Sequence, residues 1–293
     1  MTSDFVERVK NGLGNSAYSL WLPGLTAELA EVGWSKLCHD TGLSPSNYGT
    51  ARVIKRSAVA PRRIVARVPA SLAADHLDQI LHVEILDKNL AKNYEETGVK
   101  FYTAEEISNL HILEQLEEGI AFLRLLPSLF VVTAKLIKSI HLIDSGDDDY
   151  DISFSEPQIP FTVFVSIPRR RSLHAALRVT EALVHEAMHL QLTLIEEVLT
   201  LIHPTSGKYF SPWRGEFRNA RGVLHALYVF RVIDCFFGEL LRQELISAKY
   251  KDYILERGRE IRVQINQVRD FLESPELTGS GKKFVSRLID IHQ

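Results

Sequence analysis

The sequence predicts a mainly α-helical fold that forms a single domain over residues 1–293, with a small β element just before the first of two long helices. Two long apolar segments, 173–202 and 220–246, predict helices because their apolar residues recur at helical spacing and the segments are too long for strands. A segment rich in β-branched and aromatic residues, 161–167, lies between two prolines and predicts the strand. No internal repeat and no linker rich in Gly, Ser or Pro divides the chain, which favours one domain.

The composition is that of an ordinary globular protein and argues against several other classes. Hydrophobic residues make up 45% of the 293 residues and charged residues 24%, and 11 Pro with 16 Gly are too few for a disordered chain. The net charge of −3 gives no bulk attraction for nucleic acid or for an anionic membrane, so we expect neither as a partner. Two apolar stretches of near membrane-span length, 120–137 and 223–241, carry charges in their middle and predict buried helices.

The start of the chain and its cysteine count predict a cytoplasmic protein. Acidic residues, Asp4 and Glu7, occupy the start, where a signal peptide has a basic and then an apolar run. Cys38 and Cys235 are too few for a disulfide framework and lack the paired spacing of a thiolate metal site. We therefore expect two buried thiols in a reducing compartment.

The N-terminal region, 1–110, is expected to be mostly helical. Its first forty or so residues predict helical pieces that end at glycines, the polar segment 43–48 predicts a loop, and 63–68 predicts a short strand. The segment 71–93 predicts a further helix, with Ser71 as its N-cap.

The elements after this region follow from capping signals and prolines. Thr103 and Glu106 have the spacing of a capping box and predict a helix start. That helix should run to about Leu126, because Pro127 then breaks or kinks it. The remaining segments predict a polar loop over 144–151 and amphipathic helices over 252–271 and 282–291.

An H-E-x-x-H motif lies within 144–246, the segment that we expect to form the core of the metal site. His185 and His189 are four residues apart in a strong helical pattern, so both imidazoles lie on one helix face and can reach one metal ion. Glu186 lies about 100° from His185 around the helix. Neutral imidazole binds Zn, Fe, Cu and Ni alike, so the motif indicates a metal without identifying it. The alternative is that both histidines belong to a solvated polar stripe.

A third histidine lies on the next predicted helix. His225 is the only side chain within 222–230 that is expected to titrate near neutral pH. The intervening loop allows the two helices to pack antiparallel, which would let His225 face the first pair. The alternative is a buried histidine that is satisfied within the core.

Three arginines precede this histidine. Arg221 and Arg218 lie four and seven residues before His225 and fall on its helix face, and Arg214 comes just before the helix. Guanidinium groups gathered near a metal suit bidentate binding of a carboxylate. The alternative is that the arginines pair with nearby glutamates, namely Glu196, Glu197 or Glu216.

Other chemistries that use these residue types fit the chain less well. A metzincin needs a third histidine six residues after the second, and Ile195 occupies that position. A peptidase that uses Glu186 as general base would need a glutamate ligand on a later helix, and no motif marks one. His76 and Asp78 have the H-x-D spacing of an iron triad, but such triads lie on strands, of which this chain has too few.

Four short motifs occur in order between about residues 144 and 239, roughly a third of the chain. They are SFSEPQIP at 153–160, LVHEAMH at 183–189, SPWR at 211–214 and RGVLH at 221–225. In their order and spacing they resemble the α-ketoglutarate-dependent HExxH peptide β-hydroxylases of ribosomal-peptide natural-product pathways.

This resemblance implies the ligands of the site. It implies an Fe(II) ion held by His185, His189 and His225, with positions open for 2-oxoglutarate and O2. One or more of three arginines is implied to bind the distal carboxylate of 2-oxoglutarate, namely Arg214, Arg218 and Arg221.

The reaction implied is hydroxylation of the β-carbon of a residue in a ribosomally made peptide. Glu186 is the candidate catalytic group, orienting a ligand or a bound water. The basic run 169–171 is a candidate contact for an acidic leader segment of that peptide or, alternatively, a solvated charge run. Two rival functions stay open: a zinc metallopeptidase of the HExxH type with Glu186 as general base, and a non-catalytic helical scaffold that binds peptides. The sequence leaves the oligomeric state open.

Overall fold

The computed structural model of the chain describes residues 2–41, 62–66, 79–86, 88–109, 111–147, 151–156, 161–204 and 207–291. The chain divides into two compact units, one of Met1–Gly33 with Gln191–Gln293 and one of Trp34–Leu190. This division does not test whether the chain folds as a single domain, so that expectation stays a prediction. The loop expected at 43–48, the cap at Ser71 and the pair His76 and Asp78 lie outside the described residues.

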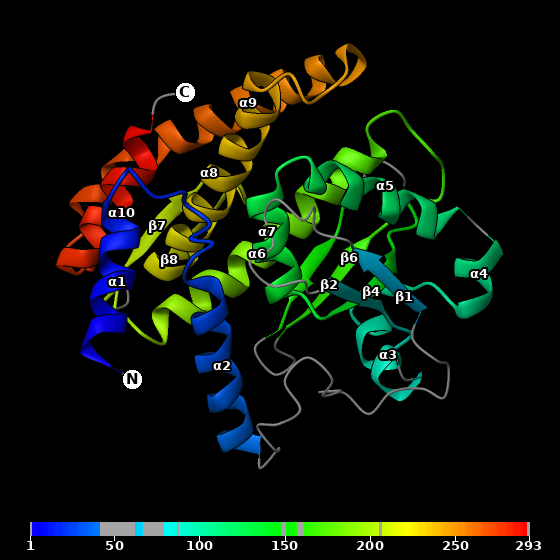
Figure 1. Ribbon diagram of the computed structural model, residues 1–293, viewed down its shortest axis with the longest axis horizontal. Helices are drawn as coiled ribbons and strands as arrows, with labels where there is room; N and C mark the ends of the chain where they lie inside the picture. The colour runs from blue at the N-terminus through cyan, green and yellow to red at the C-terminus, as the bar shows by residue number, and fades with distance from the viewer. Residues whose placement is uncertain are drawn as a thin grey trace. The chain divides into compact units, whose positions relative to one another are not determined.

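Helices dominate the fold, which confirms the mainly α prediction (Figure 1). In chain order they are α1 (Ser3–Gly14), α2 (Thr26–Thr41), α3 (Lys88–Glu95), α4 (Ala104–Asn109), α5 (Ile112–Arg124), α6 (Pro127–Leu136), α7 (Ala175–Glu196), α8 (Ala220–Arg242), α9 (Ala248–Gln267), the 3₁₀ helix η2 (Arg269–Glu273) and α10 (Gly279–Asp290). The two long helices predicted on either side of the loop at 203–219 are α7 and α8. Within the described ranges, no helix is both long and apolar enough to cross a membrane.

The β structure is larger than the small element that the sequence predicts. The strands are β1 (Arg62–Ala66), β2 (Gln79–Val83), β3 (Lys100–Phe101), β4 (Ser139–Asp144), β5 (Ser153–Ser155), β6 (Thr162–Ser166), β7 (Lys208–Ser211) and β8 (Glu216–Asn219). The first six form one sheet in the order β1-β2-β4-β6-β5, with β3 paired to β4, and the last two form a hairpin. Strand β6 is the strand predicted over 161–167, so that prediction is confirmed.

The central strands of the sheet are parallel, and its edges are antiparallel. Strands β2, β4 and β6 run parallel, whereas β1 and β5 run antiparallel to their neighbours. All five residues of β6 are buried. Burial on both faces is typical of parallel strands, and it explains why this strand reads as a continuous apolar run in the sequence.

The helix predicted over 71–93 is wrong for residues 79–83, which form a strand, and is confirmed for residues 88–93, which are helical. These two stretches are β2 and the start of α3, and β2 pairs with β1 on one side and β4 on the other. A short apolar run cannot be assigned to helix or strand from its periodicity alone. Pairing with β4, more than fifty residues away in sequence, therefore decides its conformation.

The capping box predicted at the start of α4 is confirmed. The backbone N–H of Glu106 donates to Thr103 Oγ1 at 3.2 Å, and the backbone N–H of Thr103 donates to Glu106 Oε2 at 3.0 Å. The helix does not continue as one element to Leu126, because α4 ends at Asn109 and α5 begins at Ile112. Pro127 is the first residue of α6, where its missing N–H costs nothing.

One face of the sheet packs against α3 (Figure 1). Phe154 of β5 stacks on Phe164 of β6, with ring centroids 4.5 Å apart and planes 11° apart. Tyr94 of α3 lies 5.4 Å from the Phe164 ring, and His141 of β4 stacks on the same ring at 5.1 Å. This aromatic cluster fixes the position of β5 at the edge of the sheet.

The N-terminal part of α7 lies on the opposite face. Neighbouring residues of a strand point to opposite sides, so Ser153 points away from Phe154 and towards α7. Helix α5 packs closely on α7 at Gly119, where an added Cβ would lie only 2.8 Å from Val179 Cγ1. Thr180 Oγ1 donates to the Gly119 carbonyl at 2.8 Å. The absence of a side chain at this glycine thus lets α5 hold the helix of the candidate metal site.

Helix α8 forms the core of the unit made of 1–33 and 191–293. Asn219 caps it, since its side chain accepts a hydrogen bond from the Gly222 backbone N–H at 2.7 Å. The buried hydroxyl of Tyr228 bonds the carboxamide oxygen of Gln191 and lies 3.0 Å from the Leu20 carbonyl oxygen. These contacts tie α8 to the first turn after the unit boundary in α7 and to the segment before α2.

A buried ion cluster further along α8 joins it to two other helices. Asp234 accepts from Arg231 at 2.8 Å and from Arg262 of α9 at 2.6 Å. Arg231 also donates to the Leu288 carbonyl of α10 at 2.6 Å. Because each buried charge is paired and hydrogen-bonded, the cluster is tolerated inside the core.

Candidate functional site

Helix α7 presents its two predicted metal ligands side by side, as the four-residue spacing requires. His185 Nε2 lies 3.1 Å from His189 Nε2, and the two ring centroids are 4.7 Å apart. The His185 side chain is 24% exposed, so it is accessible from solvent, while Val184 and Met188 on the other sides of the helix are fully buried. The packing of α7 therefore fixes which face the histidines share.

The separation of the two nitrogens fits a common metal ion. Imidazole nitrogens bind such ions at about 2.0–2.1 Å, so nitrogens 3.1 Å apart subtend roughly 95–100° at one ion. That angle suits two adjacent positions of a six-coordinate ion such as Fe(II) and is only slightly below the tetrahedral angle that Zn prefers. The placement of His185 and His189 is therefore compatible with one shared metal ion, and this geometry does not distinguish between metals.

Glu186 is buried and held in place by the edge strand. Only 2% of its side chain is exposed, and Ser153 Oγ of β5 donates to its Oε1 at 2.8 Å. The same oxygen lies 3.9 Å from His185 Nε2. Glu186 is thus next to the nitrogen that is predicted to bind a metal, and it is oriented by a hydrogen bond from a residue 33 positions earlier in the chain.

His225, the predicted third ligand, belongs to the other compact unit. It lies on the second turn of α8 and is nearly buried, and its Nε2 lies 3.0 Å from Glu196 Oε2. Burial opposes ionisation of Glu196, but the hydrogen bond and the charges of His225 and Arg221 outweigh it and lower the pKa of this carboxyl. The nitrogen that would bind a metal is therefore engaged with a carboxylate, and metal binding would have to exchange that partner.

The three arginines predicted to bind 2-oxoglutarate lie in the same unit as His225 but differ in their contacts. Arg221 donates to Glu196 at 2.8 Å, and Arg218 of β8 is 4.0 Å from Glu216. These are two of the carboxylates that the pairing alternative names. Arg214 lies exposed in the β7–β8 turn and makes no side-chain hydrogen bond or ion pair with any described residue.

The hairpin that carries Arg214 and Arg218 is an element that the sequence did not predict. Phe210 and Phe217 face each other across its strands, with centroids 5.7 Å apart, and both are exposed. Trp213 stacks on Phe230 of α8 at 5.3 Å with nearly parallel rings. The hairpin is thus anchored to α8 by one aromatic pair and presents another to solvent.

The basic run 169–171 is engaged in ion pairs. Arg169 donates to both carboxylate oxygens of Asp144 and to Glu106 at 3.0 Å, and Arg171 donates to Glu118. The hydrogen bonds from Arg169 hold the pKa of Asp144 below its ordinary value, even though partial burial acts in the opposite direction. Much of the charge of this run is therefore already compensated by acidic residues of the same unit.

Sequence reasoning missed two residues that now define the site. The sequence gives Ser153 no role beyond membership of a motif, and it offers Glu196 as a partner of the arginines without linking it to His225. Hydrogen bonds over 33 and 29 residues leave no local pattern. The only signal for Glu196 was its position seven residues after His189, which places it on the same face of α7.

Within the described ranges, no group of three or more His, Cys, Asp or Glu side chains is arranged to hold a metal ion. Of the three predicted metal ligands, His185 and His189 lie next to each other in one compact unit, and His225 belongs to the other unit. Comparison of the chain with models of known protein families and with curated protein sequences gives no match.

Proposed function

We propose that this protein is a non-haem Fe(II), 2-oxoglutarate-dependent oxygenase that hydroxylates the β-carbon of a residue in a ribosomally made peptide. The observation that carries the proposal is the convergence of His185 Nε2 and His189 Nε2 at 3.1 Å on one helix face. The ordered motifs that resemble the peptide β-hydroxylases support the choice of iron and of 2-oxoglutarate. We place the reaction in the cytoplasm.

In this proposal His185, His189 and His225 hold the iron as neutral imidazoles. When bound, iron with 2-oxoglutarate supplies the oxidation of a C–H bond: one atom of O2 enters the peptide, and the other enters the succinate formed as 2-oxoglutarate loses CO2. Three neutral ligands leave the full charge of the ion uncompensated, which favours an anionic co-substrate. His225 takes part once its Nε2 exchanges Glu196 for the metal.

Arg214 is the residue best suited to bind the distal carboxylate of 2-oxoglutarate. Its guanidinium has no partner among the described residues, whereas that of Arg221 is already paired with Glu196. A guanidinium that must first break an ion pair gains less from a new carboxylate. We therefore assign the main contact to Arg214 and subsidiary contacts to Arg218 and Arg221.

Glu186 acts in this proposal by orienting the metal site. A carboxylate that is 2% exposed and bonded by Ser153 can hold a neighbouring ligand or a bound water in place. The rival proposal, a zinc peptidase, uses the same carboxylate as a general base, which its closeness to His185 also allows. The scaffold rival assigns no chemistry to these residues.

Anaerobic addition of Fe(II) and then 2-oxoglutarate tests the proposal. We expect a weak visible charge-transfer band and, after admission of O2, formation of succinate. His189→Ala should abolish both, while His203→Ala, an exposed histidine in the loop before β7, should retain them. The absence of a band together with Zn-dependent and Glu186-dependent peptide cleavage would replace the proposal by the peptidase. If His189→Ala retains both metal binding and peptide binding, the scaffold is favoured.

The arginine assignment is tested by 2-oxoglutarate binding. Arg214→Ala should weaken binding roughly 10- to 100-fold, the range for loss of a charge-assisted hydrogen-bonded pair. Arg221→Ala should change it less than Arg214→Ala does. The reverse order would move the main contact to Arg221.

A further inference from the structure

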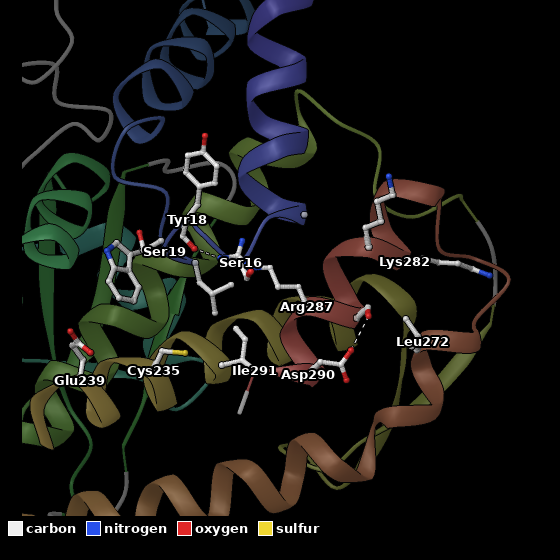
Figure 2. Close-up of a pocket in the computed structure, with 15 residues that line it drawn as sticks. Ser16, Tyr18, Ser19, Cys235, Glu239, Leu272, Lys282, Arg287, Asp290 and Ile291 are labelled. Atoms are coloured by element: carbon white, nitrogen blue, oxygen red, sulfur yellow. Dashed lines mark hydrogen bonds between the residues drawn. The ribbon is translucent and has the colours of Figure 1, made fainter. Parts of the chain in front are cut away.

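A pocket of about 940 Å³ opens in the unit made of 1–33 and 191–293, away from all the residues assigned above (Figure 2). Its walls come from the segment after α1, the C-terminal half of α8, η2 and α10. The volume lies in the range of pockets that take small organic ligands. None of the proposed metal or 2-oxoglutarate ligands lines this pocket, so the proposed reaction does not explain it.

Helix α10 forms one wall of this pocket with two adjacent stripes of side chains. One stripe contains Lys282, Ser286 and Asp290, and the other contains Lys283, Arg287 and Ile291, the residue that follows the helix. Residues four apart share a helix face, and eight residues span about 12 Å. The wall is therefore elongated, with both lysines at the N-terminal end of α10.

The N-terminal end of this wall carries positive charge that no described residue neutralises. Lys282 and Lys283 are exposed and form no ion pair or side-chain hydrogen bond within the described ranges. The acidic residues of the pocket are already engaged: Glu239 pairs with Arg242 at 2.6 Å, and Asp290 accepts from Ser286 at 3.0 Å. The first turn of the helix adds the positive end of its dipole to the two lysines.

Arg287 adds a buried donor between the two ends of the pocket. Its terminal nitrogens donate to the carbonyls of Gly12, Leu13 and Tyr18, which fixes the guanidinium, while its Nε is buried and has no hydrogen-bond partner. Burial lowers the pKa of this group, as expected where a cation lacks a compensating anion. Figure 2 shows Arg287 in the middle of the pocket, with Lys282 on one side of it and Cys235 on the other.

The remaining wall is largely apolar. Trp21 and Leu20 contribute from the segment before α2, Leu272 from η2, and Ile291 from the end of α10. The Cys235 side chain of α8, which forms no disulfide, lies with Ile291 on the side of Arg287 away from Lys282, whereas Leu272 lies on the Lys282 side (Figure 2). The pocket thus joins a cationic end to an apolar interior.

We propose that this pocket binds a small amphipathic anion, a molecule with a carboxylate, sulfonate or phosphate head on an elongated apolar body. The head lies at Lys282 and Lys283, and the apolar body extends past Arg287 towards Trp21, Cys235 and Ile291. Arg287 lies between the two ends, with its guanidinium held in place by backbone carbonyls. The proposal is independent of the iron chemistry and stands or falls separately from it.

Protection of Cys235 from a thiol reagent provides the test. Cys235 is half-buried in the pocket, whereas Cys38 is only 3% exposed, so peptide mass spectrometry of iodoacetamide-treated protein distinguishes the pocket thiol from a buried reference. Laurate, kept below its micelle concentration, is the probe. At about ten times its Kd it should slow Cys235 labelling about tenfold, because a bound ligand leaves about one pocket in eleven open. Dodecanol, its uncharged counterpart, and inorganic phosphate, a head without a body, should slow labelling less than twofold.

Charge variants show where the head binds. Lys282→Gln combined with Lys283→Gln should raise the laurate concentration for half-protection roughly three- to tenfold, as expected for the loss of two exposed charges. Lys208→Gln, which removes an exposed lysine of β7 outside the pocket, should leave it unchanged. Far-UV circular dichroism checks that each variant is folded.

Several results would overturn the proposal. Equal protection by dodecanol, equal protection by phosphate, or an unchanged laurate requirement in the double lysine variant each contradicts an amphipathic anion held by these lysines. If Cys235 resists the reagent even without ligand, tryptophan fluorescence serves instead, because Trp21 lines the pocket. A laurate-dependent change that Trp21→Phe removes supports the proposal, and no change in the unmodified protein refutes it.

Discussion

Replacing Ser153 by alanine tests whether the edge strand holds Glu186 in place. The Ser153 hydroxyl donates to Glu186 Oε1 at 2.8 Å, and the carboxylate is only 2% exposed, so water cannot readily replace the lost donor. A hydrogen bond to a charged group contributes about 1.5–3 kcal/mol. We expect Ser153→Ala to lower the free energy of unfolding by about that amount at neutral pH.

Ser155→Ala is the matched control for this prediction. Ser155 lies two residues further along β5, so it points to the same side of the sheet and is also half-buried. Its hydroxyl makes no hydrogen bond with any described residue. Its loss should therefore change stability by less than about 0.5 kcal/mol.

Urea unfolding of the metal-free protein measures the stability, and calorimetric titration with Fe(II) or Zn measures the consequence for the site. If Glu186 orients a metal ligand, loss of its positioning bond should weaken metal binding about 10- to 100-fold. Equal midpoints and equal metal affinities for Ser153→Ala and Ser155→Ala would refute the positioning role of the serine.

Three further changes test the packing that supports the two units. Asp234→Ala leaves Arg231 buried without its carboxylate and should cost about 3–5 kcal/mol in urea unfolding. Tyr228→Phe removes a buried hydroxyl and the hydrogen bond that it donates to Gln191 or Leu20, which should cost about 1–3 kcal/mol in the same assay. Asp144→Asn should lower the urea midpoint at pH 7 and lose this effect as the pH falls below about 3.8. The reason is that the hydrogen bonds from Arg169 lower the folded-state pKa of Asp144, so its stabilisation is present above the unfolded-state pKa and disappears as the carboxyl becomes protonated.

Each of these expectations can be contradicted. An unchanged urea midpoint for Asp234→Ala would show that the free energy of the ion pairs only offsets the cost of desolvating their charges. A Tyr228→Phe protein of full stability would mean that its acceptors find other donors. An Asp144→Asn effect that is equal at pH 7 and pH 3 would assign the loss to packing instead of charge.

The sequence predicted well those elements whose signals are local. Helices α7 and α8 follow from apolar residues repeated over more than five turns, and the start of α4 follows from a capping box of four residues. Strand β6 was recognisable because β-branched residues lie between two prolines. In each case the interactions that define the element lie within a short stretch of chain.

The sheet could not be predicted in the same way, because its pairing is non-local. Strand β2 pairs at His82 with Ser139 of β4, and β4 pairs at His141 with Phe164 of β6. Helix α6 and strand β4 also share one apolar segment, which periodicity alone does not divide. The order of the parallel strands depends on contacts between residues more than twenty positions apart, and no single stretch contains that information.

The candidate site shows the same contrast between local and non-local signals. Spacing alone predicted that His185 and His189 would share a helix face, and the structure brings their nitrogens to 3.1 Å. The donor to Glu186 and the acceptor for His225 come from residues 33 and 29 positions away. A motif thus identifies the histidine pair, whereas the hydrogen-bond partners of Glu186 and His225 emerge only from the tertiary structure.

The boundary between the two units cuts α7 directly after Leu190, one residue beyond His189. A separately expressed fragment of 34–190 would therefore carry the complete H-E-x-x-H sequence at a helix terminus. The last four carbonyls of such a terminus lack intrahelical partners, and the last turn frays. His189 would then sample many orientations, and the fragment would lose chelating power while its motif stayed intact. Residues 191–196, which carry none of the motif, continue α7 past His189 and supply the intrahelical hydrogen-bond partners that the last carbonyls of the motif would otherwise lack.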